Sequence, residues 1–298
     1  MSSRHSQFVT RLGSVVFSAA EWYVARKATA AEAEESLGKI SRLIYPTIIV
    51  RKQRLRALSN LAMAFPEWDN ARRREVSANV FRHFAQITGD FLYSPRRTDE
   101  EVMGSEVVGE GFAREATALD KGIILVTGHF GNWERLGQWV RCRFGNLTVV
   151  ARDANDADMQ RRVASIRERA GVEAVSRGAN PRILLRKLQN NEVLGILPDQ
   201  NSDESFVPFF GKPCGTVLGP AKLHIRTGAP ILPVFCIRTG PAQYRIEIKS
   251  PIISEPEEDA TSVMTRVNAV LEAAIREHPE QWLWLHDRWK SARRRGLL

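Results

Sequence analysis

Two side chains able to move a proton lie close together near the middle of the chain, His129 and Glu134. Residues 123–127 are apolar and rich in β-branched side chains, which indicates a buried strand. Glycines at 128 and 131 favour a tight turn. Residues 132–144 have helical spacing, with Asn132 as the expected N-cap. His129 is therefore expected where a strand ends and a helix begins, a place where α/β folds bind ligands.

The separation of five residues decides how these two side chains can meet. On one regular helix they would lie about 140° apart around the axis. They can meet if His129 lies in the turn and Glu134 in the first helical turn. The carboxylate can then hold one imidazole nitrogen and leave the other as a general base, which suits the activation of a substrate hydroxyl. A simpler explanation is that Glu134 complements the helix dipole and that His129 is a surface or capping residue.

The sequence around this pair resembles a known family. The stretch His129-Phe-Gly-Asn-Trp-Glu134 is similar to the His-x4-Asp/Glu box of glycerolipid acyltransferases, and most similar to that of the bacterial lipid A late (lauroyl/myristoyl) acyltransferases. Further matching stretches follow in order: Val150-Ala-Arg152, Leu197-Pro-Asp199-Gln200, Val207-Pro-Phe-Phe-Gly211, Gly228-Ala-Pro-Ile-Leu-Pro233 and Pro279-Glu-Gln-Trp-Leu-Trp-Leu-His-Asp-Arg-Trp-Lys290. The resemblance covers most of the chain between residues 40 and 290.

The resemblance implies transfer of a fatty acyl group from a thioester, on acyl carrier protein or coenzyme A, to a lipid hydroxyl. Acyltransferases of mycobacterial glycolipids share the pattern, so the resemblance does not fix the acceptor, which is expected to be a lipid A precursor or a related glycolipid or phospholipid. His129 would be the base and Glu134 its orienting group, with no metal and no cofactor besides the thioester. Two alternatives use the same groove: a thioesterase or lipid hydrolase, and a non-catalytic lipid-binding protein. No Gly-x-Ser-x-Gly stretch is present, which disfavours a serine esterase.

Arg152 and Asp199 follow two further predicted strands. The guanidinium of Arg152 offers a planar fork of donors for a phosphate or a developing oxyanion, although a surface ion pair explains it equally well. Arg167 is a second, weaker candidate. Asp199 is expected at the same edge of a parallel sheet as His129, where Asp199 and Gln200 would shape the site or simply form a turn after Pro198.

An aromatic stretch follows, with Phe206, Phe209 and Phe210 inside glycine and proline punctuation. It is too short and too rich in proline for a central strand. It is expected to line an acyl groove, where each buried methylene contributes about 0.8 kcal/mol. A buried loop that fills the core is the alternative. Gly211 and Lys212 come next, and Lys212 is placed to meet a phosphate.

The overall pattern predicts an α/β fold, with a mainly parallel or mixed central sheet flanked by helices and preceded by an N-terminal helical region. Expected strands cover residues 123–127, 147–151, 192–197, 231–237 and 244–249, the last as an edge strand. Expected helices cover 32–45, 47–65, 70–93, 132–144, 156–170, 181–190, 218–227 and 259–278. Residues 95–101 read as a charged linker. We therefore divide the chain into a helical, membrane-associating region over 1–100 and a catalytic domain over 101–298.

The charge distribution points to an acidic partner. The 298 residues carry a net charge of +9, and the basic excess is concentrated in the first 100. This suits an anionic membrane surface or an acidic carrier protein. No zinc-finger, KH or RRM signature supports nucleic acid as the partner. Three widely spaced cysteines argue against a disulfide scaffold or a zinc site and for a reducing compartment.

Membrane attachment is expected to be peripheral, on the cytoplasmic face of the inner membrane. No apolar run approaches the ~18–20 residues needed to span a bilayer. Many members of the resembled family carry an N-terminal spanning helix, whereas residues 8–23 here read as an amphipathic helix. Near the other end, Trp282, Leu285, His286 and Trp289 follow helical spacing. Trp282 is expected in the core, and the basic residues 293–295 at an anionic lipid surface.

Overall fold

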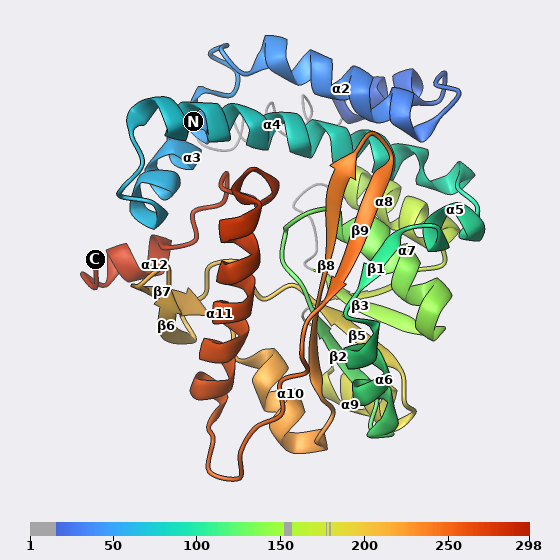
Figure 1. Ribbon diagram of the computed structural model, residues 1–298, viewed down its shortest axis with the longest axis vertical. Coiled ribbons are helices and arrows are strands. Elements are labelled where there is room, and N and C mark those ends of the chain that lie inside the picture. Colours follow the sequence, from blue (N-terminus) through green and yellow to red (C-terminus); the bar gives the residue numbers. More distant parts are fainter. Residues whose placement is uncertain (1–15, 152–156, 177, 179) are drawn as a thin grey trace.

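The computed structural model describes residues 16–151, 157–176, 178 and 180–298. Its centre is a seven-stranded sheet in the order β1-β9-β8-β2-β5-β3-β4 (Figure 1). The strands are β1 (Glu106–Val108), β2 (Ile123–Val126), β3 (Leu147–Ala151), β4 (Glu173–Ser176), β5 (Val193–Ile196), β8 (Ile231–Gly240) and β9 (Gln243–Ile248). Neighbouring strands are parallel except β8 and β9, so the predicted mixed, mainly parallel sheet is confirmed.

Strand β2 shows why the sheet is covered on both faces. Its four residues are all buried, and alternate side chains enter different cores. Ile123 and Leu125 pack with α6 (Glu110–Ala118) and α7 (Trp133–Phe144) on one face. Ile124 and Val126 pack on the other face with α9 (Pro181–Gln189), α10 (Gly219–Thr227) and α11 (Ala260–Glu277). A continuous apolar run of this kind is what a strand between two helical layers requires.

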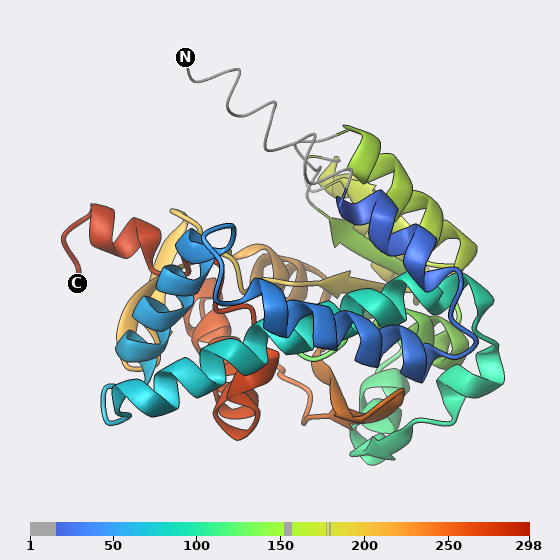
Figure 2. The same ribbon diagram turned by 90° about the horizontal axis from the view of Figure 1, so that it is seen from above.

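The N-terminal helices lie across one end of this sheet (Figures 1 and 2). Residues 16–24 are helical, followed by α2 (Ala30–Ile44), α3 (Arg51–Ala64) and α4 (Asn70–Tyr93). The earlier part of the predicted amphipathic helix lies outside the described residues. Helix α4 has the predicted bounds, with the Asp69 carboxylate capping its first turn. Helix α3 begins later than predicted, at Arg51, because residues 45–50 after α2 form turns.

The N-terminal helices share one hydrophobic core with the C-terminal part of the chain. This cluster joins α3 and α4 to Phe130, to α11 and to the tryptophans of residues 282–289. It also receives the two-stranded sheet of β6 (Ser205–Phe209) and β7 (Lys212–Thr216). The boundary near residue 100 therefore marks a change of secondary structure. That the regions on its two sides are separate domains stays a prediction.

Three expectations about local structure need correction. The predicted linker contains a 3₁₀ turn (Ser94–Arg96) and α5 (Asp99–Met103), because Thr98 and Glu101 form a capping box. Strand β9 is not an edge, since the short strand β1 pairs with its outer side. No correction is needed for α8 (Ala157–Arg169), which forms where a helix over residues 156–170 was expected.

The third correction concerns residues 282–289, which do not form the predicted helix. They connect a 3₁₀ turn (Pro279–Gln281) to α12 (Lys290–Arg294) without regular helical structure. Trp282 is extended and forms a bridge with Phe130, and the Leu283 N–H donates to the His129 carbonyl at 3.0 Å. Backbone groups of this segment therefore hydrogen-bond to the distant turn at residues 129–131 and not to each other in the regular pattern of a helix. Trp282 is buried as predicted. Within the described residues, no helix has the length and apolar character needed to cross a membrane.

Candidate active site

The turn that carries His129 is held by backbone contacts from two other parts of the chain. Strand β2 ends at Val126 and α7 begins at Trp133, with the Asn132 side chain accepting the Arg135 N–H as predicted for an N-cap. Gly131 donates to the Gln281 carbonyl at 2.9 Å and has φ 59°. A Cβ there would lie 2.1 Å from the Cys236 carbonyl oxygen, so only glycine fits. The position of His129 is thus fixed by the backbone.

The carboxylate that holds the imidazole belongs to Asp199. The two side chains meet at 2.8 Å, between His129 Nδ1 and Asp199 Oδ1. Strands β2 and β5 are parallel neighbours with Val126 paired to Ile196, so their carboxyl ends place both residues at one edge of the sheet, as expected. Because an ionised carboxylate only accepts, Nδ1 carries the proton and Nε2 is left as the base.

Asp199 is buried, and both of its carboxylate oxygens accept hydrogen bonds. Besides the ring, its Oδ2 accepts the His129 backbone N–H at 2.7 Å and the Trp282 indole N–H at 2.9 Å. Burial alone would raise the pKa of this carboxyl, but the charge and hydrogen bonds of His129, with that of Trp282, lower its pKa to about 2. The group is therefore ionised throughout the neutral range.

The other imidazole nitrogen, Nε2, lies beside Gln200. His129 Nε2 lies 3.3 Å from the side-chain amide nitrogen of Gln200, and the side chain of His129 remains 22% exposed. Burial lowers the pKa of His129, but the charge and hydrogen bond of Asp199, helped by Glu134, outweigh it, and the pKa is raised above its ordinary value. The ring is thus oriented, basic and reachable.

Glu134 has a different role from the one expected. Its carboxylate is bound by the guanidinium of Arg167, with Nε at 2.9 Å and Nη2 at 2.5 Å, and by the Trp133 indole N–H at 3.0 Å. The expectation that Glu134 orients the imidazole is corrected, because Asp199 occupies Nδ1. Glu134 nonetheless contributes its charge to the site, since it raises the pKa of His129 while Arg167 opposes it.

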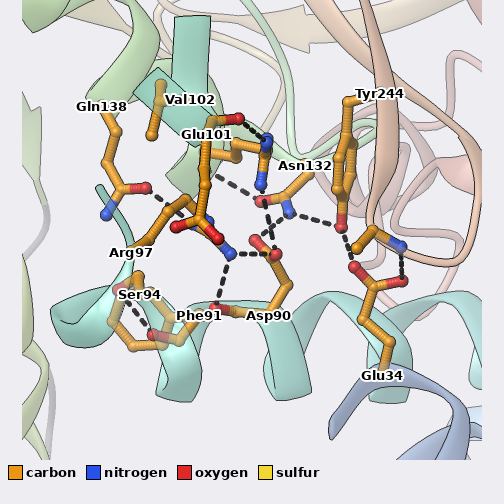
Figure 3. A network of polar contacts seen from close by, with 12 residues as sticks. Glu34, Asp90, Phe91, Ser94, Arg97, Glu101, Val102, Asn132, Gln138 and Tyr244 are labelled. Carbon is orange, nitrogen blue, oxygen red and sulfur yellow. Dashed lines mark hydrogen bonds and ion pairs between the residues drawn. The ribbon is translucent and has the colours of Figure 1, made fainter. Parts of the chain in front are cut away.

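A buried polar network positions the start of α7 (Figure 3). Asp90 on α4 accepts a hydrogen bond from Asn132 Nδ2 at 2.7 Å and pairs with the guanidinium groups of Arg97 and Arg135. Asn132 Nδ2 also donates to the Tyr244 hydroxyl at 3.1 Å. These groups come from elements far apart in sequence and are almost completely buried, so together they lock the turn to α4.

The network continues to α2 through Tyr244, whose hydroxyl donates to Glu34 at 2.6 Å (Figure 3). Glu34 also accepts from Arg238 Nε at 2.8 Å and from the Ala242 N–H. Burial and the nearby charges of Asp90 and Glu34 raise the pKa of Tyr244 well above its usual range. The phenol therefore stays protonated and remains a donor.

Sequence reasoning missed His83 and Asp90, both on the inner face of α4. His83 Nε2 lies 3.1 Å from the Gly131 carbonyl oxygen. Burial lowers the pKa of His83 to about 3, so the ring is neutral and donates this hydrogen bond. The only signal in the sequence was a polar residue on an otherwise apolar helical face, which does not identify its partner.

The aromatic stretch lies deeper than an open groove would require. Phe209 and Phe210 are buried in the core cluster of α3, α11 and the C-terminal tryptophans, with Trp282 5.5 Å from Phe209 between ring centroids. Their burial matches the alternative of a segment that fills the core, although residues 205–209 form strand β6 and not a loop. Phe206 is half-buried under the Arg295 guanidinium. Phe210 and Gly211 form the turn into β7, which begins at Lys212, and Arg152 lies outside the described residues.

A cavity of about 300 Å³ lies elsewhere, between α5, α7 and the end of α8, and its lining includes Arg97, Gln138, Arg141 and Gly171. None of His129, Glu134, Asp199 and Gln200 lines it. This cavity is therefore separate from the candidate catalytic residues.

Comparison with known proteins gives a consistent result. Residues 6–291 match the model of the bacterial lipid A biosynthesis acyltransferase family. The chain is 29% identical over 180 residues to a phosphatidylinositol mannoside acyltransferase of Mycobacterium tuberculosis, which is 58% of this chain and 56% of that protein. It is 28% identical over 244 residues to the lipid A biosynthesis palmitoleoyltransferase of Escherichia coli, covering 79% of this chain and 78% of that protein.

A lipid A biosynthesis acyltransferase of Haemophilus influenzae is 26% identical over 242 residues, covering 79% of this chain and 75% of that protein. Among solved structures, the 1-acyl-sn-glycerophosphate acyltransferase PlsC of Thermotoga maritima matches with 17% identity and a TM-score of 0.38, over 77% of this chain and 97% of that one.

Proposed function

The chain belongs to the bacterial lipid A biosynthesis acyltransferase family, and we propose that it moves a fatty acyl chain from an acyl thioester to a hydroxyl of a lipid A precursor or a related glycolipid or phospholipid. The donor thioester is carried by acyl carrier protein or by coenzyme A. The observation that carries the proposal is the imidazole of His129, which Asp199 holds through Nδ1 while Nε2 has no carboxylate partner and the side chain is partly exposed. Relatives named for lipid A and for phosphatidylinositol mannoside point to a glycolipid acceptor.

The proposed reaction uses one base, which takes a proton from the acceptor hydroxyl and later gives it to the leaving thiolate. His129 Nε2 takes the proton of the acceptor hydroxyl as the oxygen attacks the thioester carbonyl carbon. Asp199 stabilises the imidazolium through the ion pair at Nδ1, a role that its low pKa supports. The carbon–sulfur bond then breaks, and the imidazolium gives its proton to the departing thiolate. No metal and no covalent acyl–enzyme intermediate is required.

Arg167 is the described residue best placed to meet negative charge in this reaction. Glu134 fixes its guanidinium through two parallel hydrogen bonds, from Nε and Nη2. This arrangement holds a cation close enough to His129 to affect its pKa. We assign to Arg167 the stabilisation of the oxyanion or of a substrate phosphate, and to Glu134 the positioning of Arg167.

The proposed place of action is the cytoplasmic face of the inner membrane, with peripheral attachment. Thioester donors are made in the cytoplasm and the acceptor lies in the bilayer, so the enzyme must work where both meet. The basic excess of the first 100 residues supports attraction to an anionic surface.

The test follows thiol release from an acyl thioester with and without a lipid acceptor, using the purified protein and matched variants. His129→Gln is expected to lower the transfer rate by about 10²–10⁴, the usual contribution of a general base. Asp199→Asn is expected to lower kcat severely, while Glu134→Gln is expected to affect both kcat and KM because it frees Arg167.

Melting curves of the same variants separate lost chemistry from lost fold. Near-normal transfer by a well-folded His129→Gln protein would overturn the mechanism. Acceptor-independent thiol release would indicate a thioesterase, and binding of lipid without any thiol release would indicate a lipid-binding protein.

A further inference from the structure

The connection between α2 and α3 exposes an unusual cluster of aliphatic side chains. Leu43 is 76% exposed, Ile48 78% and Ile49 71%, and Ile40, Ile44 and Leu55 beside them are also exposed. We refer to residues 40–55 as the α2–α3 tip. Isolated exposed apolar residues are normal on a protein surface, but a contiguous group of this kind marks a contact surface.

The tip is held in a defined shape, so these side chains are presented outward by the fold. Arg54 donates from its guanidinium to the backbone carbonyls of Tyr45 and Thr47, and the Thr47 hydroxyl donates to the Ile44 carbonyl at 2.6 Å. The Tyr45 ring packs edge-on against Phe81 of α4, with centroids 5.2 Å apart. The apolar tip is therefore a built feature of the N-terminal helices.

Positive charge surrounds the apolar tip. Residues 36–66 contain six lysines or arginines and no aspartate or glutamate. Four of the bases are exposed and have no carboxylate partner among the described residues: Lys39, Arg42, Arg51 and Lys52. By contrast, the basic residues 293–295 pair with Asp203 and Asp287. An aliphatic tip flanked on both sides in the sequence by exposed, unpaired bases matches the interface of an anionic bilayer.

The buried side of α3 contacts the C-terminal segment that borders the candidate active site. Asn60 on α3 donates to the carbonyls of Trp284 and His286, at 2.8 and 2.7 Å. His286 Nε2 in turn accepts the backbone N–H of Asn201 at 2.9 Å, next to Gln200. In Figures 1 and 2, α3 and α12 lie on the same side of the molecule. A bilayer that binds the tip would therefore face the segment that borders His129.

We propose that the α2–α3 tip inserts its aliphatic side chains into the interface of an anionic phospholipid bilayer and so presents the catalytic edge to lipid-embedded acceptors. This rests on the proposed function for its purpose, but membrane insertion is measured without catalysis. Lipid is the favoured partner because the most exposed large side chains of the tip, Leu43, Ile48 and Ile49, are all aliphatic. An acidic carrier protein would need the bases but not these three side chains.

The first test measures binding of the full chain to phosphatidylcholine vesicles, with and without phosphatidylglycerol, by co-sedimentation. Ile48→Ser with Ile49→Ser is expected to weaken binding to the anionic vesicles by at least about tenfold, since buried apolar area is lost. Arg51→Gln with Lys52→Gln is expected to weaken it about fivefold per charge. Ile225→Ser is the matched control, because Ile225 is 48% exposed but lies on α10, at the opposite end of Figure 1.

The second test asks whether the tip enters the lipid. A polarity-sensitive dye is attached to Ile48→Cys in a Cys142→Ser background, since Cys214 and Cys236 are buried. Its emission is expected to shift to the blue with anionic vesicles and to be quenched by brominated acyl chains, whereas a dye at Ile225→Cys is expected to do neither. Absence of shift and quenching would overturn the insertion.

The outcomes separate the two proposals. Unchanged vesicle binding by the isoleucine pair overturns the inference, even if acyl transfer is intact. If the isoleucine pair lost binding to acyl carrier protein but kept its binding to vesicles, the inference would also be overturned, and the partner of the tip would be a protein. Tip-dependent insertion by a protein that transfers no acyl group would uphold the inference and reject the proposed function alone.

Discussion

His129 combines properties that an isolated histidine does not have. Asp199 fixes its tautomer, the backbone N–H of His129 binds the same carboxylate, and Nε2 lies beside the Gln200 amide without a carboxylate partner. The pKa of His129 is raised because the Asp199 carboxylate and the nearby Glu134 outweigh the effect of burial. A stronger base is also protonated over more of the acid range, so the proposed use of His129 as the base predicts the direction in which activity depends on pH.

The pH dependence of kcat/KM should show an acid limb governed by His129. The base works only when neutral, so activity is expected to rise with pH and to reach its plateau above a midpoint higher than the ordinary histidine value of about 6.5. Asp199→Asn removes the largest interaction that raises this pKa, so the midpoint is expected to move to lower pH while the plateau falls. The measurement is a series of initial rates across pH for both proteins.

A control and a contrary result complete this test. Glu255→Gln changes an exposed carboxylate away from the site and should leave the profile unchanged. If Asp199→Asn left the midpoint in place or moved it to higher pH, the limb would have to come from another group, and His129 would not be the base.

At the scale of elements, α4 positions the catalytic turn. His83 and Asp90 lie two turns apart on its inner face, and they bind Gly131 and Asn132 respectively. A helix of 24 residues is stiff, so these two contacts fix both the height and the orientation of the turn. The turn is thereby placed by an element from the N-terminal third of the chain.

Loss of the His83 contact should reduce both stability and turnover. His83→Ala leaves the buried Gly131 carbonyl without this donor, which is expected to cost about 1–3 kcal/mol of unfolding free energy. We expect a lower kcat with little change in KM, because the base is displaced while the substrate contacts remain. Since His83 is neutral, the loss should be the same at every pH of the neutral range. Rates and urea unfolding curves measure both effects.

His83→Gln retains a side-chain N–H at a similar reach and is expected to recover part of the activity. A purely space-filling role would instead be rescued equally well by His83→Leu. Equal rescue by leucine, or a kcat loss that varies with pH as His129 titrates, would contradict the positioning role.

At the scale of the whole molecule, one core connects the two ends of the chain. Asn60 and the carbonyls of Trp284 and His286 are separated by more than 220 residues in sequence. The same cluster contains Phe209, Phe210 and three buried tryptophans, and Trp282 reaches from it to Asp199. The Asp199 carboxylate is thus supported by a core to which the N-terminal helices contribute.

Asn60→Leu should therefore weaken the whole protein and not only α3. The buried Trp284 carbonyl and the partly buried His286 carbonyl lose their donor, and the expected loss is about 2–4 kcal/mol of unfolding free energy from two unmade hydrogen bonds. Thermal unfolding should remain a single transition with a lower Tm. Ser59→Ala, at the exposed neighbouring position, should stay within about 0.5 kcal/mol of the wild type. Separate melting of the helical region would show that the core does not couple the two ends.

The sequence alone determined the local elements and the class of the fold. Strand β2, helix α7 with its Asn132 cap and the bounds of α4 were all predicted, because apolar periodicity and capping act between residues a few positions apart. The position of His129 in a turn followed from the same local signals. The matching motifs also identified the family, which the comparison confirmed.

The tertiary structure decided which residues work together. Asp199 lies 70 residues after His129, and only the pairing of β2 with β5 shows that it, and not the nearer Glu134, binds the ring. The tryptophan-rich segment has helical spacing, but its backbone bonds to the turn at residues 129–131 compete with a local helix. Contacts of this kind depend on strand order and on packing across the core, which residue spacing along one chain does not specify.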